Sequence, residues 1–271
     1  MKFPSQTVAL LLLTTLAAPA QPSFSELPAS NLLRAYIQHI SNAPDQFQRY
    51  TYVILHRDQN FVHGKLTSED TYRSELTYIA GLPYTHRLEH NGKPLQGKEL
   101  QQEDELYART VKDRTGLTDE LRRSLLHAKS RSVQTFSNEH LLTDFHPEII
   151  GHPTFDGHPA LVLDLTPINA DAPPNLQRHI LLTLDAANLN LLQSRVEFLV
   201  PDDGFSQGTI IIERLTYVDG TLLPAQTSVD TTVEAKRLFH TEAIHLIATD
   251  TFSDYRRFTT TVTLKSTPDP N

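Results

Sequence analysis

Hydrophobic and polar residues alternate along most of the chain, in short runs separated by glycine, proline, asparagine or aspartate. In the segment 226–233, every odd-numbered residue is threonine or valine and every even-numbered residue is polar. This period of two is typical of antiparallel strands that have one buried and one solvated face. The runs are 50–57, 70–79, 84–90, 160–165, 177–184, 191–200, 208–217, 226–233, 238–248 and 255–264. They predict a mainly β (α+β) protein, built on an antiparallel barrel or a strongly curved antiparallel sheet.

Two parts of the chain show helical spacing instead. In the segment 30–41 the apolar residues fall on one face, and a serine and an asparagine at its start can cap the helix. From about residue 97 to residue 145 the chain is highly charged, and Gly116 is placed to end its first helix. The helical stretches in this region are 99–112, 118–131 and 137–145. They carry too few apolar residues to form a bundle alone, so we expect a helical insertion that packs one face against the sheet.

The first twenty residues have the features of a secretory signal. Lys2 precedes an apolar stretch, 8–16, that is shorter than the roughly 20 apolar residues of a membrane-spanning helix. An Ala-Pro-Ala sequence then places small residues where a signal peptidase cuts. An uncleaved anchor is the alternative, but the proline disfavours continuation of the helix. We expect residues 1–20 to be a signal peptide, and residues 21–271 to be one exported domain in the periplasm with no transmembrane segment after processing.

Composition narrows the classes of function. The chain has 24 lysine and arginine residues against 32 aspartate and glutamate residues, a net charge of −8, which is the wrong sign for a nucleic-acid-binding protein. It has no cysteine, which excludes a disulfide framework, thiol chemistry and the lipid-attachment site of a lipoprotein. We therefore expect a mature chain that is not tethered to a membrane and that depends on apolar burial for its stability.

The sequence contains no recognisable catalytic motif. We find no glycine-flanked serine, no HExxH and no glycine-rich phosphate loop. Asp202 and Asp203 could form a carboxylate pair, but their place between a proline and a glycine favours a solvated turn. The sequence has 13 histidines, and we expect His86 and His90 to share a strand face with no carboxylate beside them. We thus predict no enzyme activity, no cofactor and no metal site.

Aromatic and basic residues alternate near the C-terminus. On a strand, Tyr255 and Arg257 lie on one face. Arg257 could stack on Tyr255 at the edge of the sheet, which is a structural role. Alternatively, its guanidinium could stand at the mouth of a cavity and meet a carbonyl or phosphate group of a ligand.

In the order of these motifs, the chain resembles members of the LolA/LolB superfamily of outer-membrane lipoprotein-sorting proteins. Because it lacks the lipobox cysteine, it resembles the soluble LolA-type branch of that superfamily. The similarity rests on turns and strand ends: Tyr50-Thr51-Tyr52, Asn91-Gly92-Lys93-Pro94-Leu95, Phe155-Asp156-Gly157-His158-Pro159-Ala160, Leu163-Asp164-Leu165-Thr166-Pro167, Leu182-Thr183-Leu184-Asp185, Val218-Asp219-Gly220-Thr221-Leu222-Leu223-Pro224 and Tyr255-Arg256-Arg257-Phe258. It implies an unclosed β-barrel capped by helices, with an apolar cavity, in proteins that carry lipoprotein acyl chains or sense envelope lipids and are not enzymes. This chain departs from the pattern in being longer than the typical carrier and in having a more charged helical insertion.

In such a fold the cavity is lined by every second residue of each strand, since these side chains point to the same face. The predicted lining residues are Leu161, Leu163, Leu165, Ile180, Leu182 and Leu184, with Tyr255 and Arg257 at the cavity mouth. The alternative is that the six apolar residues form ordinary core under the helices. Three hypotheses for function follow: a carrier or sensor of lipid or lipoprotein acyl chains, a cell-envelope interaction or scaffold protein with a filled core and a protein partner, and a hydrolase with an unrecognised site.

Overall fold

The structure is a computed structural model, and it describes residues 24–42, 50–125, 138–202, 204–236 and 241–257. The predicted signal peptide at residues 1–20 lies outside these ranges. Within them, no helix combines the length and the apolar character that crossing a membrane requires.

Most of the described chain is β-strand. The strands are β1 (Tyr50–Val62), β2 (Lys65–Ile79), β3 (Leu82–His90), β4 (Lys93–Pro94), β5 (Phe145–Gly151), β6 (Thr154–Phe155), β7 (His158–Pro167), β8 (Arg178–Asp185), β9 (Leu191–Phe198), β10 (Ile210–Val218), β11 (Thr221–Lys236) and β12 (Thr241–Arg257). The helices are α1 (Ala29–Asn42), α2 (Gly97–Thr115) and α4 (Asn138–Thr143), with 3-10 turns at Phe24–Glu26 and Pro174–Leu176. Residues 119–125 are also helical.

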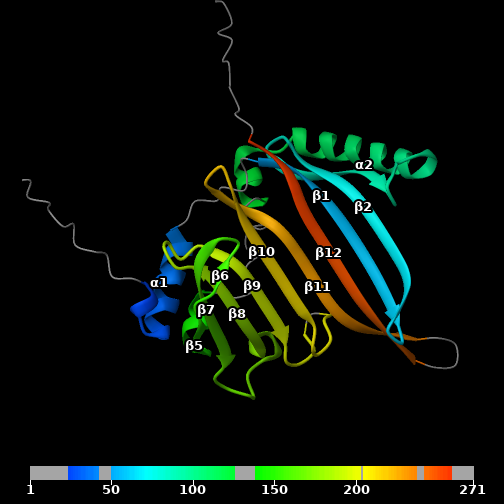
Figure 1. Cartoon of the computed structure of the whole chain (residues 1–271). Coiled ribbons are helices and arrows are strands. Elements are labelled where there is room, and N and C mark those ends of the chain that lie inside the picture. The colour runs from blue at the N-terminus through cyan, green and yellow to red at the C-terminus, as the bar shows by residue number, and fades with distance from the viewer. Residues whose placement is uncertain (1–23, 43–49, 126–137, 203, 237–240, 258–271) are drawn as a thin grey trace, which may run out of the picture.

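All strands belong to one antiparallel arrangement, which is strongly twisted and curved (Figure 1). The order across the sheet is β4-β3-β2-β1-β12-β11-β10-β9-β8-β7-β5, and the short β6 pairs with β7. The two ends of this path, β4 and β5, do not pair with each other, so the sheet is not closed into a barrel. The predicted fold class, a mainly β protein with an unclosed antiparallel sheet and a few helices, is confirmed.

Two predicted element boundaries are wrong. The runs 238–248 and 255–264 were expected to be separate strands, but residues 241–257 form the single strand β12. The linking residues contain no glycine or proline, and β1 pairs with β12 on both sides of them, so the strand continues through a single bulge. Residues 258–264 lie outside the described ranges. Phe145, expected at the end of a helix, instead begins β5 opposite Pro167.

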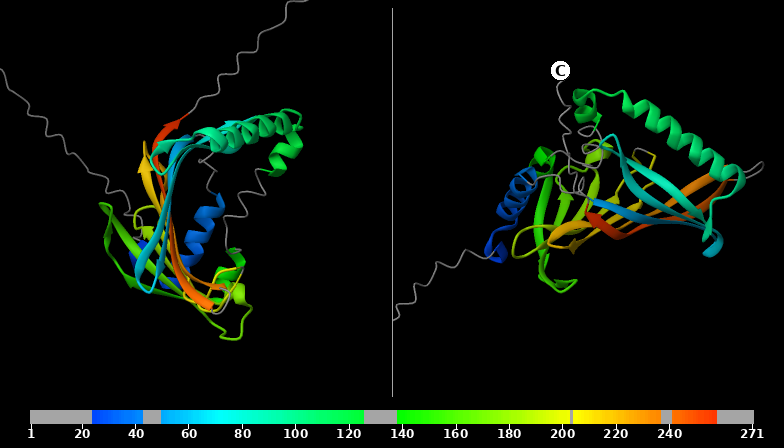
Figure 2. Two further views of the ribbon diagram at one scale, coloured as in Figure 1. Left: turned by 90° about the vertical axis from the view of Figure 1, so that its right-hand side faces the viewer. Right: turned by 90° about the horizontal axis from the view of Figure 1, so that it is seen from above.

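The helices occupy different ends of the sheet (Figure 2). Helix α1 lies beside the strands β5 to β8, whereas α2 runs along β2 and β3 at the other end. The buried positions of α1 are Leu32, Leu33, Tyr36 and Ile37, at the helical spacing that the sequence predicts. The main core therefore lies between α1 and one face of the sheet.

The loop after β9 folds back onto the sheet. Arg178, which is 5% exposed, donates a hydrogen bond of 2.6 Å to Asp202 and lies 4.3 Å above the ring of Phe198. The ring of Phe205 packs on the same phenylalanine, with ring centres 5.0 Å apart. Asp202 lies in a turn, as predicted, and its backbone pairs with that of Phe205. The side chain is only partly solvated, because its carboxylate neutralises a buried guanidinium. Asp203 lies outside the described residues.

Candidate functional site

One face of the sheet contacts α1, and we call it the α1 face. Residues directly opposite each other in antiparallel strands point to the same side of a sheet, so the pairing register follows this face from strand to strand. One row of paired residues crosses nine strands from β7 to β3: Leu163, Leu182, Ser194, Glu213, Thr227, Asp250, His56, Tyr72 and His90. The row begins apolar under α1 and becomes polar and charged toward β3. The α1 face therefore has two chemically different halves.

The half under α1 is closely packed. The six residues predicted to line a cavity all lie here, side by side on β7 and β8, and each is at most 6% exposed. They form one cluster with the apolar side of α1 and with Phe145, Leu176 and Leu189. The structure thus brings the six predicted residues together and places α1 directly on them.

Beyond this cluster the α1 face continues without α1 packed on it. A second row of paired residues lies beside the first on the same face. It contains Leu165, Ile180, Val196, Ile211, Val229 and Ala248. Val196 of β9 still packs against the cluster. Ile211, Val229 and Ala248, on β10 to β12, are only half-buried. An apolar strip, partly accessible to solvent, therefore extends from the core across the middle of the sheet.

A carboxylic acid borders this strip. Glu213 of β10 lies on the α1 face between Ser194 and Thr227. Burial raises its pKa, because removing a carboxylate from water disfavours the charged form. The buried Tyr36 of α1 also has a raised pKa, mainly from burial and in addition from the negative charge of Glu213. The acid thus lies near α1, at the boundary between the packed and the accessible halves.

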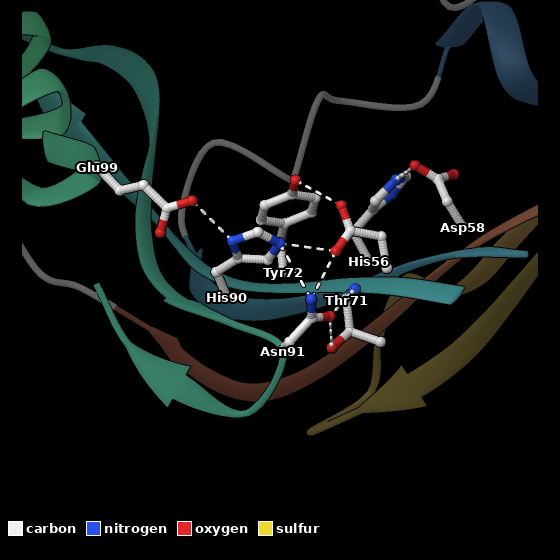
Figure 3. A network of polar contacts seen from close by, with 8 residues as sticks. His56, Asp58, Thr71, Tyr72, His90, Asn91 and Glu99 are labelled. Carbon is white, nitrogen blue, oxygen red and sulfur yellow. Dashed lines mark hydrogen bonds and ion pairs between the residues drawn. The ribbon is translucent and has the colours of Figure 1, made fainter. Parts of the chain in front are cut away.

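The charged end of the α1 face is a network of hydrogen bonds centred on two histidines (Figure 3). The Nε2 atom of His90 is 2.6 Å from Asp70, and its Nδ1 atom is 2.8 Å from Glu99 in the first turn of α2. The ring of His90 stacks on Tyr72 with 4.5 Å between ring centres. Tyr72 and Asn91 donate further hydrogen bonds to Asp70, at 2.7 and 2.8 Å. This part of the network therefore joins β2, β3, the turn after β3 and α2.

The second histidine lies two strands closer to the centre of the sheet. His56 of β1 is 2.9 Å from Asp58 and 2.7 Å from Asp250 of β12. Burial, the largest single influence, lowers the pKa of His56. Its hydrogen bonds to the carboxylates of Asp58 and Asp250, together with their negative charge, outweigh this effect and raise the pKa above its ordinary value. His56 thus links β1 to β12 on the same side of the sheet as His90.

Sequence reasoning missed the His90 network. We expected His86 and His90 to share a face, but a bulge in β3 near Leu88 places His90 opposite Tyr72 and His86 opposite Glu75, on different faces. The expectation that His90 has no carboxylate beside it is also wrong. Its partners lie 20 and 9 residues away in the chain and become neighbours only through strand pairing and the docking of α2. Asn91-Gly92, with φ of 50° and 71°, was the one local signal for this region.

The hydrogen bonds in the network shift its acid–base equilibria. Donation from Tyr72 and then from His90 lowers the pKa of Asp70 to about 2. Conversely, the hydrogen bonds to Asp70 and then to Glu99 raise the pKa of His90. Among the described residues, no group of three or more histidine and carboxylate side chains has an arrangement that could hold a metal ion.

The two residues predicted at a cavity mouth lie at the end of β12. The ring of Tyr255 packs on Tyr52 and Tyr50, with centres 5.4 and 6.5 Å apart, and its hydroxyl donates to the carbonyl of Pro224. Arg257 pairs in register with Tyr50 and is exposed. Asp254, with φ of 54°, forms a bulge just before Tyr255. Tyr255 thus belongs to an aromatic cluster at the sheet end, with the exposed Arg257 beside it.

An open groove of about 750 Å³ lies where the loop after β9 meets the ends of β11 and β12. Its lining includes Phe205, Val233 and Ala243 together with polar residues of the loop. Val233 is 40% exposed. This groove is separate from the histidine network, which lies on β1 to β3 and β12 near α2.

Comparison with solved structures finds similar folds. An outer membrane lipoprotein-sorting protein domain from Vibrio parahaemolyticus is 12% identical, with a TM-score of 0.36, over 86% of this chain and 94% of that one. A LolA superfamily protein from Nitrosomonas europaea is 11% identical, with a TM-score of 0.30, over the same shares of the two chains. A MucA/MucB complex structure from Pseudomonas aeruginosa matches at 11% identity, with a TM-score of 0.26, over 83% of this chain and 94% of that one.

Neither the protein-family models nor the curated protein sequences give a match to this chain. The LolA-type similarity concerns the arrangement of the backbone, at identities too low to assign a function.

Proposed function

We propose that this protein is an exported, non-catalytic carrier or sensor that binds an apolar ligand, a lipid or the acyl chains of a lipoprotein, on the α1 face of its sheet. The observation that supports the proposal most directly is the strip formed by Ile211, Val229 and Ala248. These residues continue the buried core across the middle of the sheet but stay half-buried. Apolar surface of this kind gains about 25 cal/mol for each Å² that a ligand removes from water.

The two ends of the strip suggest how such a ligand would lie. One end meets the packed cluster under α1, to which the six predicted lining residues belong. The other end meets Asp58 and the carboxylate-bound His56, beside Ala248 in the register. An amphiphile would therefore place its hydrocarbon chain toward α1 and its polar end toward the network. In this proposal Arg257, exposed at the end of β12, is the cation at the mouth of the ligand site.

A second candidate is a cell-envelope interaction or scaffold protein with a protein partner. The observation that favours it is the close packing of the six predicted lining residues against α1, which leaves them at most 6% exposed. In that case the α1 face is filled, and the partner binds elsewhere on the surface.

The test is native mass spectrometry of the protein purified from a cell-envelope fraction, with lipid extraction of whatever accompanies it. A bound acyl-bearing species in stoichiometric amount supports the carrier or sensor. Binding of a fluorescent fatty acid is then compared between two variants of adjacent residues on β10, Ile211→Ser and Ile212→Ser. Ile211 lies on the α1 face and Ile212 on the opposite face, and both are half-buried.

We expect Ile211→Ser to raise the Kd severalfold, because the ligand covers the exposed part of the isoleucine side chain, which is a fraction of the about 1.5–3 kcal/mol that full burial contributes. Ile212→Ser should leave the Kd unchanged. A protein that carries no lipid and takes up none, or equal effects of the two substitutions, would contradict the proposal and favour the interaction protein.

A further inference from the structure

Helix α2 is held to the sheet by polar contacts. Its one buried residue among those described is Glu103, while Leu100 and Leu106 are 43% and 39% exposed. Helices in globular proteins usually dock through an apolar stripe. Since α2 buries a glutamate instead, specific hydrogen bonds and charges decide whether it stays on the sheet.

These contacts fall at three points along α2. At its N-terminal end Glu99 is 2.8 Å from Nδ1 of His90. In the middle Glu103 accepts a hydrogen bond from the hydroxyl of Tyr84 at 2.8 Å and a longer one from the Arg87 amide. At its C-terminal end Arg114 donates to the carbonyls of residues 82 and 83, at 2.9 and 3.0 Å.

Of the three contact points described, only the one at the N-terminal end of α2 includes a histidine within hydrogen-bonding distance of the helix. His86 is the other histidine near α2, and its Nε2 atom is 3.9 Å from Glu103, beyond a hydrogen bond. Tyrosine and arginine keep their protonation state through the neutral pH range. The N-terminal end of α2 is therefore the one point whose attachment can change between mildly acidic and mildly basic conditions.

The geometry around His90 makes this attachment depend on its charge. An imidazolium donates from both ring nitrogens, and here each nitrogen faces a carboxylate, Asp70 on one side and Glu99 on the other. A neutral imidazole has only one N–H, so its unprotonated nitrogen would direct a lone pair at a carboxylate. Tyr72 and Asn91 also hold Asp70, whereas Glu99 lies in the first turn of a helix. The contact that breaks on deprotonation is thus the one to Glu99.

We propose that α2 is a pH-operated strap, whose N-terminal end is fastened to the sheet by protonated His90 and released when His90 loses its proton. The groups that face His90 are Asp70 and Tyr72 from β2, Asn91 from the following turn and Glu99 from α2. Arg87 lies 4.3 Å from the Tyr72 ring, and His56 lies 6.3 Å from the same ring. Arg114 keeps the other end of the helix attached.

The direction of the pH response follows from the charges. Asp70 and then Glu99 raise the pKa of His90 above its ordinary value of 6.5. A group whose pKa is raised in the docked state stabilises docking fully below its ordinary value and loses this effect as the pH rises through the raised value. Asp70, with a pKa of about 2, stays ionised throughout. The strap is therefore fastened in mild acid and released in mild base. This inference does not depend on the identity of any ligand.

The experiment is amide hydrogen exchange of the whole protein at pH 5.5 and pH 8.5, expressed as protection factors so that the intrinsic effect of pH on exchange cancels. The amides of residues 101–103 report on the N-terminal end of α2, and those of residues 112–115 report on the end that Arg114 holds. His90→Gln and Glu99→Gln each remove the charge pair. His56→Gln is the matched control, because His56 also lies between two carboxylates but does not contact α2.

We expect protection of residues 101–103 to fall severalfold from pH 5.5 to pH 8.5, with no change at residues 112–115. His90→Gln and Glu99→Gln should each abolish this pH dependence, and His56→Gln should retain it. Equal protection at the two pH values in the native protein would overturn the proposal. So would a pH dependence that survives in either of the first two variants, or one that His56→Gln removes. If one variant fails to fold, the other still decides.

Discussion

Whether the six predicted lining residues are packed core or cavity wall can be decided by replacing one of them. Leu163 is fully buried in the middle of β7, opposite Leu182 and Ile149, within the cluster under α1. Truncating a fully packed leucine to alanine costs its transfer free energy and leaves a cavity, together about 2–5 kcal/mol. A leucine that already borders an open cavity would lose little packing, so the same change would cost about 1 kcal/mol.

The matched comparison is Ile211→Ala, on the same face but half-buried. We expect Leu163→Ala to lower the free energy of unfolding of the ligand-free protein by about 2–5 kcal/mol. We expect Ile211→Ala to lower it by about 1 kcal/mol, because part of the isoleucine side chain is in contact with water in the folded protein and contributes nothing there. The assay is urea unfolding followed by far-ultraviolet circular dichroism, accepted only where the three proteins have the same m-value.

Added lipid should distinguish the two variants in the opposite way: the stabilisation that lipid gives should fall in Ile211→Ala and not in Leu163→Ala. A ligand stabilises the folded protein by RT ln(1 + [L]/Kd), so a weaker Kd in Ile211→Ala reduces the stabilisation that lipid gives. Leu163→Ala should keep the stabilisation that lipid gives if Leu163 is packed core and does not contact the lipid. A cost below about 1 kcal/mol for Leu163→Ala, equal to that of Ile211→Ala, would refute the packing argument and make the six residues an open lining.

Two further predictions concern ionisable groups. Asp202→Ala should lower the free energy of unfolding by about 1.5–3 kcal/mol, because it removes the carboxylate oxygen 2.6 Å from the buried guanidinium of Arg178. A loss below about 0.5 kcal/mol in urea unfolding would contradict this role for Asp202. Burial raises the pKa of Glu213, so the native state prefers the protonated acid and stability falls as the pH rises from the ordinary value through the raised one. Glu213→Gln should therefore have a higher urea midpoint of unfolding than the native protein at pH 7.5, and a similar midpoint at pH 4. An equal difference between the two midpoints at both pH values would contradict the raised pKa of Glu213.

Local pattern was sufficient for much of the fold. The alternation of apolar and polar residues predicts most strands within a few residues, since side chains on a strand point alternately to two faces whatever the neighbouring strand is. The helical spacing of 30–41 likewise predicts α1 and its buried side. Asn91 and Gly92 predict a hairpin turn from their tolerance of positive φ, which the turn has. Each of these features depends on residues close together in the chain.

The candidate site could be predicted only in part. The alternation of residues along β7 and β8 correctly predicts that the six apolar residues share one face. It does not predict what covers them, because α1 lies more than a hundred residues away in the chain. The accessible strip of Ile211, Val229 and Ala248 depends on the order of the strands, which no local pattern contains. The same is true of Asp202, whose partner Arg178 is buried only once the loop folds back.

The sequence by itself determined the class of the fold, the faces of its strands, the buried side of α1 and the absence of thiol chemistry. Tertiary structure alone decided which of these faces is filled and which is accessible. It also decided where charges meet: a single-residue bulge in β3 turns His90 toward Asp70, and the docking of α2 brings Glu99 to its other nitrogen. The physical reason is that burial and hydrogen-bond geometry depend on contacts between distant segments, whereas alternation and turn preference depend only on neighbouring residues.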